Sequence, residues 1–377
     1  MGKYLQLAAL FLAASMAAGA QNQGIHRSGN EWIKEIKGTL PANKIERVRS
    51  TAGAIRVQGG NQLSITYVIR EHVYAGTEAA ARAEFKRLKF STFNSPEGAI
   101  LRADCEGTRQ GYIDFEVRVP LQTAVVKLET QGGAVSANGI NGKVVASTGG
   151  GNIQLDQIGG GVSVSSAGGG IDIGRVGRDV DANTMAGNIR VASAGGKVHA
   201  SSGGGNLNIG AAKVMTLSTG AGSISVTKCD GGIKAETGGG AVEVTESGGP
   251  AQIETSGGKI RVGVIRGGLR AETGSGPIVA TLAPGVKVFS DSRLETKMGD
   301  IIVYVPDGLG VTIVATVDTA RGFGITSEFS ELKIDKPKER FGPRAMFAKG
   351  NLNGGGPLLH VHTTTGNIEL RRMAKNE

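Results

Sequence analysis

Carboxylates are the first side chains in this sequence that could do chemistry. Two Asp or Glu carboxyl groups held about 5–10 Å apart can cleave a glycosidic bond. When equivalent positions of the sequence are compared, Asp172 has Gln154 and Arg190 as its neighbours, so the acids do not gather there. Asp179 and Asp181 are close in sequence, but we expect both to face solvent. The sequence therefore predicts no glycoside-cleaving pair in the central part of the chain.

A second set of carboxylates keeps an enzymatic alternative open. Asp300, Asp307, Asp318 and Asp335 all belong to the irregular C-terminal region, where they could meet in a lateral groove. Such a cluster would favour a polysaccharide-acting hydrolase or lyase over a protein without catalytic activity. We expect no enzyme, and the placement of these four residues is the test.

The histidines and cysteines point to structure rather than to chemistry. His360 and His362 alternate onto one face of the last predicted strand, a spacing that two metal ligands can have. Since no third ligand is evident, we expect no metal, and no Gly-rich run opens a helix as a phosphate loop would, so we expect no cofactor. Cys105 and Cys229 follow alternating apolar patterns, which indicates buried side chains. The sequence leaves open whether they form a disulfide.

The dominant pattern is an internal repeat of 18 residues, with one unit of 17. Its second unit reads VVASTGGGNIQLDQIGGG and its seventh reads IKAETGGGAVEVTESGGP. Each unit has two runs that alternate apolar and polar residues, separated by a Gly-rich corner, and this period of two predicts half-buried strands. A single apolar residue near the end of the unit, such as Ile140 or Ile158, predicts a short third side. The units begin at Val126, Val144, Val162, Val180, Val198, Met215, Ile233, Ala251 and Leu269.

This repeat predicts an all-β fold, a single-stranded parallel β-helix in which each unit forms one coil and like positions stack. We expect nine regular coils around a narrow aliphatic interior, and a right-handed solenoid. The fifth residue of every unit, from Thr130 to Thr273, is Ser or Thr. Because it precedes a Gly-rich corner, we expect its hydroxyl to bind backbone groups of the turn.

The regions that flank the repeat carry the same corner signature. A Ser or Thr followed by Gly and Ile recurs at Ser50, Thr296 and Thr363, which predicts atypical coils at both ends. The N-terminal flank also predicts a helix from the N-cap Thr77 to Lys89, with strands at 63–69 and 112–119. The expected organisation is a signal peptide at 1–20, a capping region at 21–125, regular coils at 126–286, and C-terminal coils with a capping excursion at 287–377.

Two segments resemble a known family. YIDFEVRVPLQTAVVKLETQGGAVSANGINGKVVASTGGGNIQLDQIGG and the closing GNLNGGGPLLHVHTTTGNIELRR are similar to the DUF4097 family of exported, adhesin-like bacterial proteins. The resemblance extends over residues 45–372. It implies a β-helical body, export, and an adhesive or envelope-binding role, and it implies no catalytic residues.

The first twenty residues indicate export. Lys3 precedes an apolar run over 5–18, and Ala18-Gly19-Ala20 has the small residues of a cleavage site. The run is shorter than the ~20 residues of a membrane-spanning helix, so we expect no stable membrane insertion after cleavage. The expected location is outside the cytoplasm, in the periplasm or at the cell surface.

The charge distribution argues against nucleic acid as a partner. The net charge is +9, but it is spread along the whole chain and not concentrated in a stripe. The expected partner is an envelope or surface component, either protein or glycan. A further alternative is a structural or envelope-stress element with no ligand, and the oligomeric state is left open.

Overall fold

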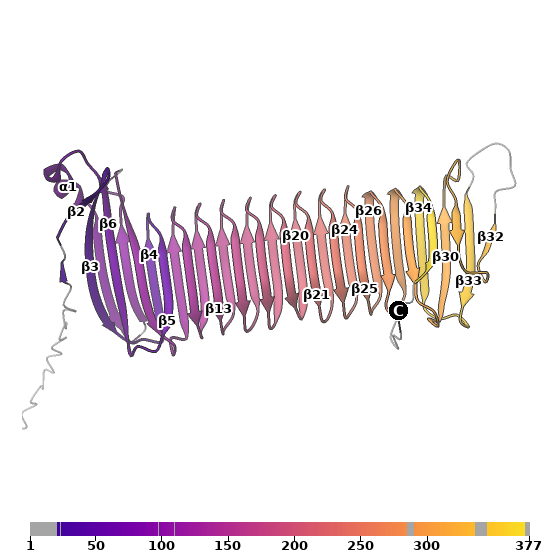
Figure 1. Cartoon of the computed structure of the whole chain (residues 1–377), viewed down its shortest axis with the longest axis horizontal. Coiled ribbons are helices and arrows are strands. Elements are labelled where there is room, and N and C mark those ends of the chain that lie inside the picture. Colours follow the sequence, from indigo (N-terminus) through magenta and orange to yellow (C-terminus); the bar gives the residue numbers. More distant parts are fainter. Residues whose placement is uncertain are drawn as a thin grey trace, which may run out of the picture.

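Two long β-sheets run the length of the molecule in this computed structural model (Figure 1). The structure describes residues 21–22, 24–96, 98–108, 110–284, 290–335 and 345–373. Within that part of the chain, sheet A has 18 strands and sheet B has 17. Neighbouring strands lie ~4.8 Å apart, so sheet B is about 80 Å long.

Both sheets begin at the N-terminal end of the rod, and their strands follow one another along its length. Sheet A contains β1 (Gln21–Asn22) and β2 (His26–Ser28), both on β3 (Glu31–Pro41), then β6 (Ser64–Tyr74), β9 (Gly111–Pro120), β5 (Ile55–Gly60), β11 (Val135–Ile140), β13 (Ile153–Ile158), β15 (Ile171–Val176), β17 (Ile189–Ala194), β19 (Leu207–Ala212), β21 (Ile224–Cys229), β23 (Val242–Ser247), β25 (Ile260–Ile265), β27 (Ile278–Leu282), β29 (Ile301–Val305), β35 (Ile368–Arg372) and β31 (Ile325–Ser327). Sheet B contains β7 (Lys89–Ser95), β8 (Gly98–Asp104), β4 (Ile45–Ser50), β10 (Val125–Thr130), β12 (Lys143–Thr148), β14 (Val162–Ser166), β16 (Val180–Thr184), β18 (Lys197–Ser202), β20 (Val214–Thr219), β22 (Ile233–Thr237), β24 (Ala251–Thr255), β26 (Leu269–Ser275), β28 (Ser292–Met298), β34 (Leu358–Thr365), β30 (Val311–Val317), β33 (Met346–Leu352) and β32 (Lys333–Asp335).

Each coil contributes one strand to each sheet, which confirms the predicted β-helix. Val144 pairs with Val162, and Val162 pairs with Val180, so the first residues of successive units are in register. The 17-residue unit keeps this register, because Val198 pairs with Met215. All the strand pairs of the regular coils are parallel, as expected when every coil runs in the same direction.

The prediction of a third side is wrong, because the coils have two sides. Ile140 and Ile158 are the last residues of β11 and β13 in sheet A, and they pair with each other. Before Ile140, Asn138 and Gly139 both turn away from the core, and Gly139 has a φ of 68°. This local bulge returns an apolar side chain to the interior after two outward residues.

The interior between the sheets is aliphatic through the regular coils. Ile153, Ile171 and Ile189 are each at most 2% exposed. Each buried side chain of this size contributes roughly 1.5–3 kcal/mol of transfer free energy. In the described residues, aromatic rings enter the core only toward the two ends of the rod. Phe329 is buried near the C-terminal end. Near the N-terminal end, Phe90 lies 5.7 Å from Tyr67 and 6.2 Å from Phe115 between ring centroids.

The hydroxyl at the fifth position of each unit is structural, as predicted. Thr148 Oγ1 donates to Gly133 O of the preceding coil at 2.8 Å and accepts from Gly151 N at 3.1 Å. The same two bonds recur at Thr184 and at Thr237. A Cβ on Gly151 would lie 2.0 Å from Gly133 O, so only glycine allows the coils to stack this closely.

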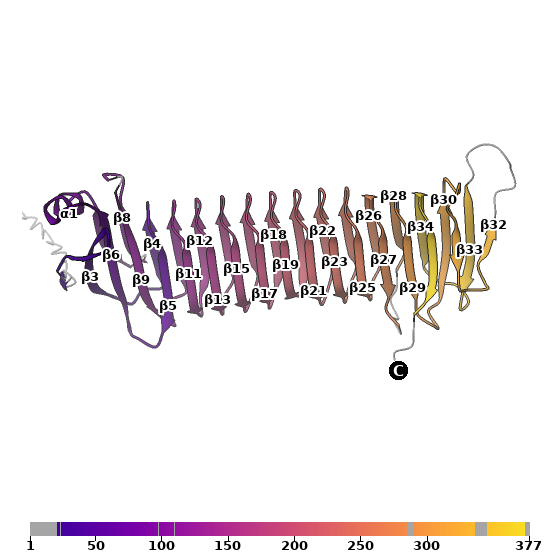
Figure 2. The same cartoon turned by 45° about the horizontal axis from the view of Figure 1, so that its top comes forward.

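At both ends of the rod, the order of the coils differs from their order in the sequence. The coil β4–β5 lies between β8–β9 and β10–β11. The final coil β34–β35 pairs with β28 and β29 on one side and with β30 and β31 on the other. Figure 2 shows β34 between β28 and β30. The three flanking coils predicted at Ser50, Thr296 and Thr363 are confirmed.

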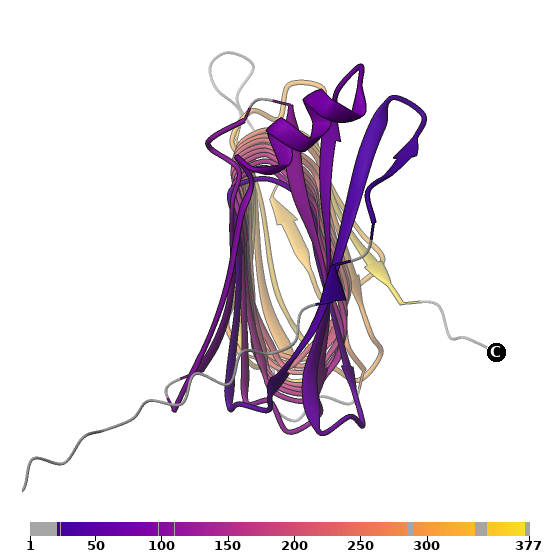
Figure 3. The same ribbon diagram turned by 90° about the vertical axis from the view of Figure 1, so that its left-hand side faces the viewer.

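The N-terminal end carries α1 (Glu78–Phe85) at one corner of the rod (Figure 3). Thr77 is its N-cap, as predicted, and its Oγ1 accepts from Ala80 N at 3.3 Å. The predicted end at Lys89 is wrong: the helix stops after Phe85, its last buried residue, because Lys89 already begins β7. The neighbouring strands β6 and β9 are longer than the ranges 63–69 and 112–119, since they pair over almost their whole length.

The capping excursion expected within residues 287–377 is partly a continuation of sheet B. β33 pairs with β30, and β32 pairs with β33, in both cases antiparallel. Among the described residues, no helix is long and apolar enough to cross a bilayer. The predicted signal peptide at 1–20 lies outside the described residues.

Candidate functional site

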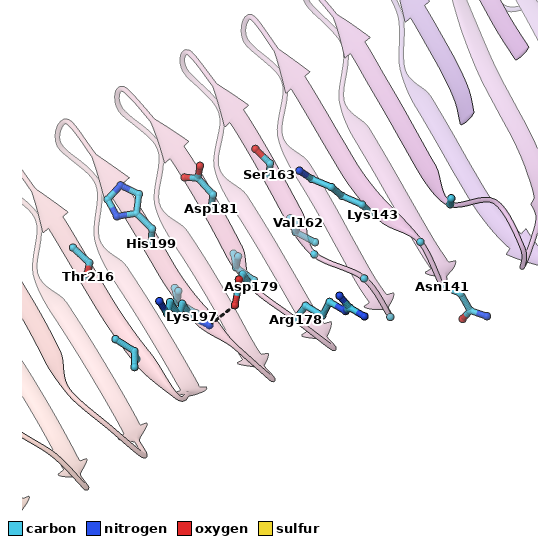
Figure 4. Close-up of a pocket in the computed structure, with 18 residues that line it drawn as sticks. Asn141, Lys143, Val162, Ser163, Arg178, Asp179, Asp181, Lys197, His199 and Thr216 are labelled. Carbon is cyan, nitrogen blue, oxygen red and sulfur yellow. Dashed lines mark hydrogen bonds between the residues drawn. The ribbon is translucent and has the colours of Figure 1, made fainter. Parts of the chain in front are cut away.

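An open groove of about 870 Å³ follows the corner at which the coils pass from sheet A back to sheet B (Figure 4). We call it the corner groove. Lys143, Arg178 and Lys197 supply its positive charge, and Gly159, Gly160 and Gly161 form part of its lining. It extends along the coils that contain β12 to β20.

Strand alternation decides which side chains line this groove. Val198 points into the core, so Lys197 and His199 on either side of it face outward. The parallel register then aligns equivalent residues of successive coils. Ser163 pairs with Asp181, and Asp181 pairs with His199, and Figure 4 shows these three side chains on successive strands.

The two aspartates of the groove already have hydrogen-bond partners. Asp179 Oδ1 accepts from the backbone N–H of Lys197 at 2.7 Å and so connects two successive coils. Asp181 Oδ1 accepts from the side-chain amide of Asn183 at 2.8 Å. Asp179 and Asp181 both face solvent, as predicted.

The cations of the groove form no ion pairs in the described residues. Lys143, Arg178 and Lys197 are exposed, and none is within ion-pair distance of a carboxylate in the described residues. In later coils, two cations near this corner form ion pairs: Lys228 lies 3.5 Å from Asp230, and Arg266 lies 2.9 Å from Glu246. In the described residues, unpaired positive charge at this corner therefore extends as far as Lys213, before the coils that contain Lys228 and Arg266.

A second groove, of about 800 Å³, follows a row of glutamates on the outer face of sheet B. Glu236, Glu254, Glu272 and Glu295 occupy paired positions on β22, β24, β26 and β28. Aligned like charges on neighbouring strands repel each other. A partner two residues earlier on the same strand offsets this repulsion in each case: Lys234 at 2.7 Å, Gln252 at 2.9 Å, Arg270 at 2.8 Å and Arg293 at 2.7 Å. This groove is therefore close to neutral.

The two histidines on β34 meet carboxylates that the sequence did not reveal. Glu295 Oε1 lies 3.7 Å from His360 Nδ1 and 3.9 Å from His362 Nδ1. Asp318 Oδ2 lies 3.0 Å from His362 Nε2. Burial lowers the pKa of His360. These contacts arise because β34 inserts between β28 and β30, and no group of three or more ligand-type residues in the described chain is arranged to hold a metal.

The carboxylates considered for catalysis have separate partners. Asp172 pairs with Gln154 and with Arg190, as expected from the repeat. Asp300 Oδ1 accepts from Asn367 N at 2.7 Å, and Asp307 Oδ1 accepts from Arg372 at 3.0 Å. Asp318 contacts His362, Asp335 ends β32, and these four C-terminal acids line neither groove.

The two cysteines are free and buried, as predicted for small apolar side chains. Cys105 follows β8 near the N-terminal end, whereas Cys229 ends β21 in the middle of the rod. Burial raises the pKa of both thiols. The disulfide that the sequence left open is absent.

The corner groove itself was missed from the sequence. Its cations lie at or just before the first residues of strands in sheet B, where the repeat tolerates Lys143, Gly161, Asp179 and Lys197 alike. Aligning the units at this position would have shown the cations together, but not which of them lack a partner.

The comparisons with known proteins are few. No family model matches the chain, and no curated protein matches it. A crystal structure of a "putative cell adhesion protein" from Clostridium sporogenes is similar over 90% of this chain and 100% of that chain, with 10% sequence identity and a TM-score of 0.21. The resemblance to the DUF4097 family thus stays a prediction from the sequence.

Proposed function

We propose that this protein is an exported, non-catalytic binding scaffold of the bacterial cell envelope, and that the corner groove is its binding surface. The observation that carries the proposal is the set of unpaired cations at Lys143, Arg178 and Lys197, at a corner where Lys228 and Arg266 of later coils are ion-paired. The predicted signal peptide and the resemblance to the DUF4097 adhesin-like family support the envelope location.

The rod suits a binding role because it holds its surface residues at fixed spacing. Stacked coils and the hydroxyl bonds between them keep neighbouring strands ~4.8 Å apart along the whole groove. A surface that is already ordered loses little conformational entropy when a ligand binds. The separate partners of Asp300, Asp307 and Asp318 support the non-catalytic part of the proposal.

Cell fractionation with a C-terminally tagged full chain tests the proposed location. We expect the protein in the periplasm or at the cell surface, shortened by cleavage after Ala20, whereas a matched chain that lacks residues 2–20 stays in the cytoplasm. An inner-membrane or cytoplasmic location of the full chain would overturn the proposal.

Chemical cross-linking on intact cells tests the proposed binding role. We expect cross-links to envelope components that decrease when Lys143, Arg178 and Lys197 are replaced by Gln. If cells without the protein keep normal attachment but alter their envelope-stress response, and no cross-link depends on the groove, a structural element without a ligand replaces the binding scaffold.

A further inference from the structure

We infer that the corner groove binds a linear anionic polysaccharide that lies parallel to the axis of the rod. This inference rests on the proposed binding role and adds the chemical class of the ligand. It follows from the charge of the groove, its direction, and the kinds of side chain that line it.

The charge of the groove favours an anionic ligand. Lys143, Arg178 and Lys197 present exposed cationic groups that the protein itself does not neutralise. Of the two acids in the groove, Asp179 is held by the Lys197 backbone N–H, so its carboxylate is partly compensated. Asp181 is bound only by a neutral amide and remains the one strong repulsive group.

The direction of the groove favours a linear polymer. The groove crosses β12, β14, β16, β18 and β20, which are successive neighbours in sheet B. Four steps of ~4.8 Å give a length of about 19 Å along the rod. Ser163, His199 and Thr216 follow the same direction and supply hydrogen-bonding groups along it.

The composition of the groove separates a charged glycan from other ligands. Residues 126–286 contain no Phe, Tyr or Trp, so the groove has no ring on which a neutral sugar or an unpaired base could stack. Recognition must therefore rely on charge and hydrogen bonds, which suits the carboxylate or sulfate groups of an acidic polysaccharide. The Gly159–Gly161 segment leaves the backbone open to close approach by such a chain.

Binding of the purified protein to defined polymers tests this inference. The probes are polygalacturonate, dextran sulfate, neutral dextran and oligo-dT, each at low and at moderate salt. We expect salt-sensitive binding to the two acidic polysaccharides, weaker binding to oligo-dT, and none to neutral dextran. Replacing Lys143, Arg178 and Lys197 together by Gln should weaken polysaccharide binding about tenfold.

A matched triple variant controls for total charge. Arg190, Lys259 and Lys349 are also cations without an ion pair in the described residues, but they lie outside the groove. Their replacement by Gln should change the affinity less than about twofold. An equal loss in both triple variants would overturn the inference, because non-specific attraction would then explain the binding.

Two further variants test the groove without removing a cation. Asp181→Asn should strengthen binding, because it removes the repulsive carboxylate. Gly161→Glu should weaken it, and here the added Cβ would lie 3.3 Å from Asp179 O, a contact that a small shift relieves. Gly168→Glu on the opposite corner, where nothing lies within 4 Å of the added Cβ, should have no effect.

The results separate this inference from the proposed function. Tighter binding to oligo-dT than to either acidic polysaccharide, or no binding to these polysaccharides at all, would overturn the ligand class. Neither result would change the cellular location, which fractionation measures independently. An unchanged melting temperature of each variant confirms that the fold is intact.

Discussion

Glu46 is an acidic residue buried in the largely apolar interior of the rod. Its side chain points from β4 into the core, and its neighbours on the adjacent strands are Val126 on one side and Ala99 on the other. Its side chain is fully buried, and neither carboxylate oxygen has a hydrogen-bond partner in the described residues. Because burial disfavours the charged form, the pKa of Glu46 rises to about 8.

Because the pKa of Glu46 is raised in the folded state, we expect the free energy of unfolding to fall as the pH rises. Its pKa is about 4.3 in the unfolded chain and about 8 in the folded one, so the folded state holds the extra proton between these values. The stability from the protonated form is fully present below pH ~4.3 and is lost as the pH rises through about 8. We expect Glu46→Gln to unfold with a weaker pH dependence, so that its stability relative to the natural chain rises by on the order of 5 kcal/mol between pH 4 and pH 9.

Thermal unfolding followed from pH 5 to pH 9 checks this prediction. The difference between Glu46→Gln and the natural chain isolates the contribution of Glu46 from that of other titrating groups. A difference in melting temperature that stays constant over this range would show that Glu46 is solvated or paired.

The sequence identified the apolar residues of the interior as buried, but it did not identify Glu46 as buried. Period-two alternation identified Ile153 and Ile171 as buried because their apolar type agrees with their position. A glutamate is expected to face solvent, and only its register with Val126 shows that it does not. The groove cations Lys143 and Lys197 escaped prediction for a related reason, since pairing between coils depends on side-chain distances.

At the scale of elements, the coil is the unit of structure. Met215, Ile233 and Ala251 begin three successive coils and pair in register, so each coil offers the same surface to the next. In such stacked repeats, stability is approximately the sum of single coils and the interfaces between them.

Deleting one whole coil should therefore leave a folded rod. Removing the 18 residues Ile233–Pro250 lets Met215 pair with Ala251 and keeps every hydroxyl above a Gly-rich corner. We expect a β-sheet circular-dichroism spectrum and cooperative unfolding, with a modestly lower melting temperature. Removing only the nine residues Ile233–Ala241 should abolish cooperative unfolding. Each later strand of sheet A would then come directly after a corner that leads into sheet B, so the two sheets could not keep their register. Similar behaviour of both deletions would contradict a coil-based fold.

Predictions from the sequence were accurate for elements that the repeat defines and poorer elsewhere. Unit starts such as Val162 and Val180 were correct because every coil repeats the same constraint. The single apolar residue at Ile140 was assigned to a third side, since a bulge cannot be distinguished from a corner by periodicity. The end of α1 was placed too late because the pairing of β7 with β8, a tertiary contact, ends the helix.

At the scale of the whole molecule, both ends of the rod are closed by coils out of sequence order. β34 forms parallel pairs with β28 and with β30, so the last coil is held on two sides. The sequence predicted this coil from Thr363, but not its position, because its corner signature is the same as that of every other coil. The order of coils depends on contacts between residues far apart in the chain, such as Thr296 and Thr363.

Removing the last coil should destabilise the C-terminal end as a whole. A chain that ends at Gly356 loses β34 and β35, and β28, β29, β30 and β31 then each lose a neighbour. We expect rapid proteolysis near residues 306–356 and a lower melting temperature. A chain that ends at Met373 retains both strands and should behave like the full protein. Equal protease resistance of the two truncated chains would contradict this role for the last coil.

The position of β34–β35 also constrains how the molecule can be made. A ribosome makes residues 358–372 after it has made β28 and β30, yet β34 occupies a place between these two earlier strands. The rod therefore cannot grow to completion by adding coils one after another as the nascent chain emerges. This end of the rod can therefore close only after residues 358–372 have been made, and any shorter nascent chain lacks the strands that complete it.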